Sequence, residues 1–151
     1  MGSLGKLSRS INGRVAVVTG AASGMGRATA HLFSDEGASV AVCDRNSEGV
    51  SEVVNEITDA GGVASGYIID LDDAAVIDDF ISQVRDDLGP VDILVNNAGV
   101  SHRGNIESEN FEDLWEMTFS VNLDAQMRLI RSCLSDLKRN EDGRIVNIAS
   151  T

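Results

Sequence analysis

The sequence predicts an α/β fold, a doubly wound parallel sheet with helices on both faces in three layers. Short apolar runs alternate with segments whose apolar residues recur at helical spacing. The runs are hydrophobic throughout, which is typical of parallel strands buried on both faces. A glycine-rich turn joins the first run to the first helical segment. With right-handed crossovers, five such strands take the order 3-2-1-4-5.

The expected elements follow one another without a repeat or linker. Strands are predicted at residues 14–19, 38–43, 67–69, 91–95 and 144–148. Helices are predicted at residues 24–36, 47–60 and 73–88, and one long helix at 111–137. The last strand is expected to be an exposed edge, because no later segment of this chain covers it. An open edge makes the isolated chain prone to aggregation.

These elements indicate one domain over residues 13–151, preceded by a loose, polar leader at residues 1–12. The leader is rich in glycine and serine and lacks the apolar core of a signal peptide. No apolar run is long enough to span a bilayer, so no membrane association is predicted. Hydrophobic residues make up 42% of the chain, an ordinary share for a globular protein.

Charge and cysteine content narrow the classes of partner. Acidic residues outnumber basic ones by 24 to 12, giving a formal net charge of −12 that would repel nucleic acid. Cys43 and Cys133 form neither a disulfide framework nor a metal cluster, and two free thiols suit a reducing cytoplasm. His31 and His102 lack ligand spacing with either cysteine, so no metal is predicted.

The glycine-rich turn is the main candidate for a binding site. Thr19 is followed by the pattern Gly-x-x-x-Gly-x-Gly, formed by Gly20, Gly24 and Gly26, and a helix begins at once. Glycine allows a sharp turn and a close approach of the backbone to a pyrophosphate. The start of the helix then offers free N–H groups and its positive dipole end to that anion. The turn therefore predicts a dinucleotide site.

An acidic residue at the end of the second strand bears on the choice of dinucleotide. Asp44 is placed to accept hydrogen bonds from an adenosine ribose and to repel a 2′-phosphate, which favours NAD over NADP. Ser23 is neutral and brings no positive charge for an extra phosphate. Arg45, which follows Asp44, moderates the repulsion between Asp44 and a 2′-phosphate. The alternative is that Asp44 is simply a solvated residue at a strand end.

With these motifs in order, the chain resembles the short-chain dehydrogenase/reductase family, whose domain is Rossmann-like. The resemblance rests on the glycine turn, on Asn96-Asn97-Ala98-Gly99 after the fourth strand, and on Arg144-Ile145-Val146-Asn147-Ile148-Ala149-Ser150. It implies an NAD-dependent interconversion of small-molecule alcohols and ketones, in a parent protein that is a homo-oligomer. The substrate itself is not indicated.

The resemblance also implies roles for individual residues. The pyrophosphate and adjacent ribose would be lined by Gly20, Ser23, Gly24, Met25 and Gly26. The adenine would contact Asp70 and Leu71, although Asp70 at this position also suits a helix cap. Asn97, Ala98 and Gly99 would lie against the cofactor ribose, although the Asn97 amide equally suits a structural bond between neighbouring strands, and the two roles are compatible.

Two catalytic residues follow from the same resemblance. Ser150 would hydrogen-bond the substrate oxygen, although by position alone it is a loop hydroxyl. Asn122 would hold a water in a proton relay, although a hydrogen-bonded core amide is the structural alternative. Trp115, Met117 and Phe119 are interpreted as packing or interface residues.

One departure from the family pattern matters most. The family places a Tyr-x-x-x-Lys pair after the serine, and here the only tyrosine is Tyr67, on the third strand. The chain is therefore expected to be a partial sequence that ends within the domain, before the remaining strands, and to be inactive alone. Two interpretations remain open: an oxidoreductase, or a non-catalytic dinucleotide-binding module.

Overall fold

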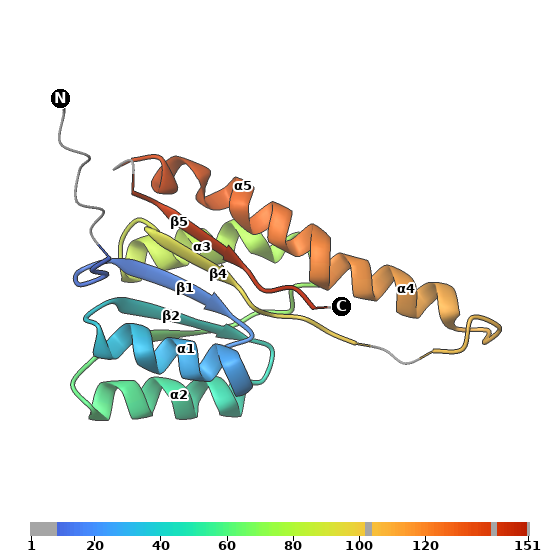
Figure 1. Ribbon diagram of the computed structural model, residues 1–151, viewed down its shortest axis with the longest axis horizontal. Helices are drawn as coiled ribbons and strands as arrows, with labels where there is room; N and C mark the ends of the chain where they lie inside the picture. Colours follow the sequence, from blue (N-terminus) through green and yellow to red (C-terminus); the bar gives the residue numbers. More distant parts are fainter. Residues whose placement is uncertain (1–8, 102–103, 140–141, 151) are drawn as a thin grey trace.

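The computed structural model describes residues 9–101, 104–139 and 142–150 and contains a five-stranded sheet of order β3-β2-β1-β4-β5 (Figure 1). Its strands are β1 (Val15–Thr19), β2 (Ser39–Asp44), β3 (Val63–Ile68), β4 (Ile93–Asn96) and β5 (Arg144–Asn147). Every neighbouring pair is parallel. The predicted sheet order and direction are confirmed.

Helices cover both faces of this sheet (Figure 1). On one face lie α1 (Gly24–Asp35) and α2 (Ser47–Asp59). On the other lie α3 (Val76–Asp87) and a continuous rod made of α4 (Phe111–Phe119), η1 (Ser120–Asp124) and α5 (Ala125–Leu137). The α4 end of the rod extends beyond the sheet. No helix within the described residues is both long and apolar enough to cross a membrane.

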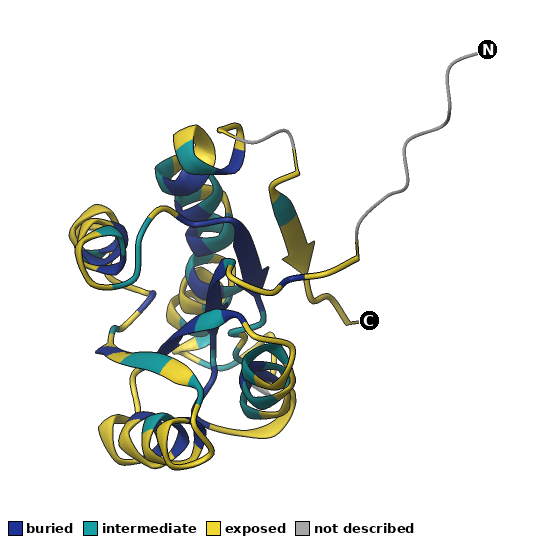
Figure 2. Cartoon of the chain, turned by 90° about the vertical axis from the view of Figure 1, so that its left-hand side faces the viewer, coloured by how far each residue is buried: buried dark blue, intermediate teal, exposed yellow. Residues whose placement is uncertain are grey.

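The core is divided by the sheet into two clusters because strand side chains alternate between its faces. Val17 and Leu94 pack with Phe80 of α3 and Leu129 of α5, whereas Val18 belongs to the cluster on the α1 and α2 side. All five residues of β1 are buried, as the uniformly apolar sequence predicts. Figure 2 shows the contrast between the buried central strands and the exposed β5.

Three features of the elements differ most from the prediction. Strand β3 begins at Val63, not at residue 67, and pairs with β2 along its whole length. Its first four residues are exposed or half-buried and include Ser65 and Gly66, so they lack the apolar run that marks a buried strand. The isolated third apolar run therefore identified only the end of this edge strand.

Helix α3 begins at Val76 and not at residue 73. The carboxylates of Asp70 and Asp73 accept hydrogen bonds from the N–H groups two residues ahead, those of Asp72 (3.1 Å) and Ala75 (2.9 Å). Such local turns compete with helix formation. The third difference is that the long helix contains the π-helical segment η1, which is described with the site below.

The position of β5 leads to the first prediction. Within the described chain β5 pairs only with β4, and Ile145 and Val146 are 42% and 43% exposed. The isolated 151-residue chain is therefore expected to self-associate as its concentration rises. Val146→Lys should reduce this association, because a charged side chain disfavours pairing at an edge. Light scattering across a dilution series measures it, and a monodisperse, cooperatively melting monomer at high concentration would contradict the prediction.

Candidate functional site

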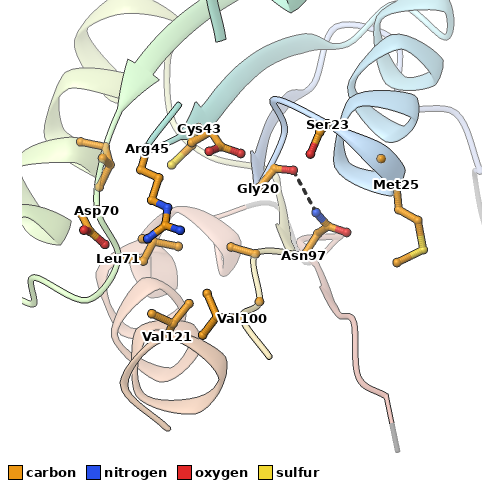
Figure 3. A pocket seen from close by; sticks show the side chains of 15 residues that line it. Gly20, Ser23, Met25, Cys43, Arg45, Asp70, Leu71, Asn97, Val100 and Val121 are labelled. Atoms are coloured by element: carbon orange, nitrogen blue, oxygen red, sulfur yellow. Dashed lines mark hydrogen bonds between the residues drawn. The ribbon is translucent and has the colours of Figure 1, made fainter. Parts of the chain in front are cut away.

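A cavity of about 420 Å³ lies where the carboxyl ends of β1, β2, β3 and β4 converge (Figure 3). This is the point where the strand order reverses, at which open α/β sheets bind ligands. Its lining includes every dinucleotide residue predicted above except Gly26, namely Gly20, Ser23, Gly24, Met25, Asp44, Arg45, Asp70, Leu71, Asn97, Ala98 and Gly99. The structure therefore brings together residues from four separate loops.

The glycine turn is so tight that two of its residues have no room for a side chain. Gly20 has φ +64°, and a Cβ there would lie 2.9 Å from the Cα of Ala98. A Cβ on Gly26 would lie 2.2 Å from the carbonyl oxygen of Gly20. Gly26 thus lets α1 start directly against the turn, although it does not itself line the cavity.

The start of α1 fits an anionic group. Ser23 precedes the helix, and its side chain makes no capping hydrogen bond. The first turn contains no acidic residue. The helix N-terminus therefore presents its N–H groups and its positive dipole end toward the cavity without a carboxylate to neutralise them. A pyrophosphate is a suitable ligand for this arrangement.

Thr19 and Asn97 join the glycine turn to the end of β4. The Thr19 hydroxyl accepts hydrogen bonds from the N–H groups of Asn97 (3.1 Å) and Ala98 (3.0 Å). The Asn97 amide donates to the carbonyl oxygens of Thr19 (2.9 Å) and Gly20 (3.2 Å), the second of which Figure 3 shows. Asn97 therefore ties neighbouring strands together while it also lines the cavity.

Asp44 and Arg45 form the wall of the cavity at the end of β2. The two oxygens of Asp44 accept hydrogen bonds from the N–H groups of Ala22 (3.2 Å) and Asn46 (3.0 Å), so its carboxylate is held in a fixed place. It is half-buried and is not the freely solvated residue of the alternative interpretation. The Arg45 side chain extends toward the middle of the cavity (Figure 3).

Asp70 and Leu71 follow β3 on the same side of the cavity. Asp70 does not cap α3, because the residue before that helix is Ala75 and no side chain caps it there. Leu71 is buried and presents an apolar surface that suits a planar base. Cys43, Ile69, Val100 and Val121 also line the cavity and were not predicted. The first three are next in sequence to predicted site residues at strand ends, so their position in the sequence could have predicted them.

Asn122 lies in η1, where the predicted continuous helix changes to a π-helix. Its amide oxygen accepts a hydrogen bond from the Val100 N–H, and its amide nitrogen donates to the Val100 carbonyl, both at 2.8 Å. This is the hydrogen-bonded amide of the structural alternative. It also fixes Val100 at the edge of the cavity, although Asn122 itself is not in the lining. Single π-turns of this kind are frequent at functional sites.

Ser150 and Tyr67 lie apart from this group. Ser150 is exposed, follows the end of β5 and does not line the cavity, so the structure does not bring it together with the predicted dinucleotide residues. Tyr67 donates a hydrogen bond to Asp87 at 2.9 Å. Burial and the bond to Asp87 raise the pKa of Tyr67 above its ordinary value, so its phenol stays protonated at neutral pH and cannot act as a base. His102 lies outside the described residues.

The two cysteines are free and buried. Burial, reinforced by Asp44, raises the pKa of Cys43, and burial together with Asp136 raises that of Cys133 to about 12. Neither thiol is therefore available as a thiolate at neutral pH. In the described part of the chain, no three His, Cys, Asp or Glu side chains form a group that could hold a metal ion.

Comparison with known proteins agrees with this geometry. The model of the short chain dehydrogenase family matches residues 14–151, and the chain belongs to that family. It is 39% identical over 140 residues to the (2S)-[(R)-hydroxy(phenyl)methyl]succinyl-CoA dehydrogenase subunit BbsD of Thauera aromatica, covering 93% of this chain and 56% of that protein. It is 37% identical over 143 residues to the 2,3-dihydro-2,3-dihydroxybenzoate dehydrogenase of Bacillus subtilis, covering 95% and 54%.

A solved structure shares the fold as well as the sequence. A metagenomic short-chain oxidoreductase in complex with NADP superposes with a TM-score of 0.88 at 37% identity, covering 94% of this chain and 64% of that one. The chain spans about half the length of the curated relatives it matches.

The crowding at Gly26 generates a prediction about stability. Gly26→Ala should lower the free energy of unfolding by about 1–3 kcal/mol, because its Cβ would overlap the Gly20 carbonyl and the Asn97 amide. Ala28→Ser, on the exposed side of the same helix, is the matched control and should change it by less than about 0.5 kcal/mol. Chemical denaturation measures both. An unchanged midpoint for Gly26→Ala would show that the turn tolerates the side chain.

Proposed function

We propose that the protein to which this chain belongs interconverts an alcohol and a carbonyl compound by NAD-dependent hydride transfer. The observation that carries the proposal is the convergence of the glycine turn, Asp44, the Asp70–Leu71 pair and the segment 97–99 around one cavity. Membership of the short chain dehydrogenase family supports it, as do the dehydrogenases among the relatives. The substrate is proposed only as a small alcohol or ketone.

The proposed binding mode follows the walls of the cavity. The N–H groups at the glycine turn and the start of α1 hold the pyrophosphate. Asp44 accepts hydrogen bonds from the adenosine ribose, and Leu71 packs on the adenine, with Asp70 beside its amino group. Asn97, Ala98 and Gly99 lie against the second ribose. When bound, the nicotinamide ring supplies the acceptor or donor of the hydride.

Asn122 and Ser150 are proposed to serve the chemical step. The Ser150 hydroxyl donates a hydrogen bond to the substrate oxygen and stabilises the charge that develops there. The Asn122 oxygen uses one lone pair for the Val100 N–H, which leaves a second lone pair for a water in the proton relay. Both roles rest on the family resemblance and on the positions of these residues after β5 and in η1.

We also propose a cytoplasmic protein that assembles as a homo-oligomer. The two buried free thiols are consistent with a reducing compartment. Phe111, Trp115 and Phe119 stack along α4 with ring centroids 6.0 and 4.7 Å apart, and Trp115 and Phe119 are 54% and 43% exposed. Such an exposed aromatic row supports an interface rather than a packing role within these residues.

Cofactor choice gives a prediction for the whole protein. NAD should bind about tenfold or more tightly than NADP, because Asp44 repels a 2′-phosphate and accepts hydrogen bonds from the ribose hydroxyls. Asp44→Ala should narrow the preference or, with help from Arg45, reverse it. Fluorescence titration with NADH and NADPH measures both affinities. Equal affinities in the unmutated protein would end this idea. NADP is the cofactor to compare, because a solved relative is in complex with it.

Catalysis gives another prediction, for these 151 residues alone. They are proposed to be catalytically incomplete, because these residues contain no Tyr-x-x-x-Lys pair and the raised pKa of Tyr67 makes it a poor substitute. General acid–base catalysis contributes about 10²–10⁴-fold, and loss of cofactor positioning costs more. Purified chain with NAD and a panel of alcohols should produce no NADH above the enzyme-free control. His102 follows the fourth strand in the sequence and is the alternative candidate for the base. Turnover that His102→Ala abolished would show that it had taken over this role.

A further inference from the structure

The glycine turn is held in place by the end of β2 as well as by the end of β4. Ala22, in the middle of the turn, is 6% exposed and does not line the cavity. Its N–H donates to Asp44 at 3.2 Å, and the N–H of Ala21 donates to the carbonyl of Cys43 at 3.1 Å. The end of β2 thus fixes two successive N–H groups of the turn.

Helix α2 meets the same residue from its other side. Gly49, in the first turn of α2, is buried, and a Cβ there would lie 2.8 Å from the Ala22 Cβ and 3.2 Å from the Ala22 carbonyl oxygen. Only a glycine allows the helix to approach the turn this closely. Gly49 does not line the cavity.

The start of α2 is held at this contact by hydrogen bonds. The Asn46 side chain caps the helix by accepting the Gly49 N–H at 3.2 Å. The Asn46 N–H in turn donates to Asp44 at 3.0 Å, so the cap is joined to the carboxylate that holds Ala22. Asp44, Asn46 and Gly49 therefore form a bracket around Ala22. A side chain at position 49 must move either the helix start or the turn.

We propose that Gly49 is a positioning residue for the dinucleotide site: by admitting α2 against Ala22, it sets the path of the turn that holds the pyrophosphate. This inference rests on the proposed function. Gly49 acts through Ala22 and does not contact the ligand. Substitution of Gly49 should therefore weaken binding of the phosphate groups of the ligand. The loss of affinity should be the same whether or not the ligand carries its ribose hydroxyls.

The test uses the whole protein with Gly49→Ala. Binding of NADH, followed by its fluorescence, should weaken about tenfold, because overpacking at this contact shifts the turn. ADP and 2′-deoxy-ADP, measured by displacement of NADH, should weaken by the same factor. Adding Ala22→Gly to Gly49→Ala removes the crowded Cβ and should restore most of the affinity. Unchanged affinity in Gly49→Ala, or no recovery in the double variant, would overturn the proposal.

Gly62→Ala is the matched control. Its Cβ would lie 2.0 Å from the Ser34 hydroxyl of α1 and 2.9 Å from Ile57 of α2, so it also crowds α2 against a neighbouring element, but at the end remote from the cavity. It should lower the melting temperature and leave the affinity for NADH unchanged. If Gly62→Ala weakened binding as much as Gly49→Ala, the effect would reflect general stability, and the positioning role would be wrong.

A second readout does not depend on any ligand. Amide hydrogen exchange in peptides that cover residues 20–26 should be faster in Gly49→Ala than in the unmutated protein, and slow again in the double variant. Unchanged exchange in the turn would overturn the positioning role. If the unmutated protein bound neither NADH nor ADP, the proposed function would fail, and the exchange measurement would still decide whether Gly49 positions the turn.

Discussion

The close approach of the glycine turn to the end of β4 is the constraint on which the site depends. The Gly20 backbone lies so near to Ala98 that no side chain fits between them. Two main-chain segments brought this close bury polar groups that need partners. Thr19 and Asn97 supply those partners with hydroxyl and amide groups. The motif residues thus serve first to hold two closely packed main-chain segments together, and the cavity lies beside this contact.

The same arrangement repeats around the cavity. Asn122 holds the Val100 backbone with both ends of its amide, and Asp44 holds the backbone of Ala22. In each case a side chain from one element fixes the main chain of another, so the loops that line the cavity are bonded to one another and not only to their own strands. A ligand that enters such a site meets N–H groups already in place, which lowers the entropy lost on binding.

The sheet and most of the cavity could be predicted because both follow from patterns that are local in the sequence. Apolar runs mark β1 and β4, and parallel topology brings their ends to one edge. What could not be predicted depends on non-local contacts. The first four residues of β3 form a strand because β2 pairs with them, although Ser65 and Gly66 have little strand propensity. The π-turn at Asn122 accompanies a hydrogen bond to Val100, which no periodicity within the helix reveals.

The net charge of the chain means that only groups close to the ligand can attract an anion at this site. The chain carries a net charge of −12, and Asp44 and Asp70 lie in the cavity lining, so its overall field opposes a dianionic pyrophosphate. At physiological salt, charges more than about 8 Å away are largely screened, so the groups in contact decide the affinity. Helices α2, α3 and α4 carry acidic residues in their first turns, whereas α1 carries none. The positive end of α1 therefore stays free of carboxylates for the proposed pyrophosphate, and an acidic side chain introduced there would remove the attraction that offsets the repulsive field.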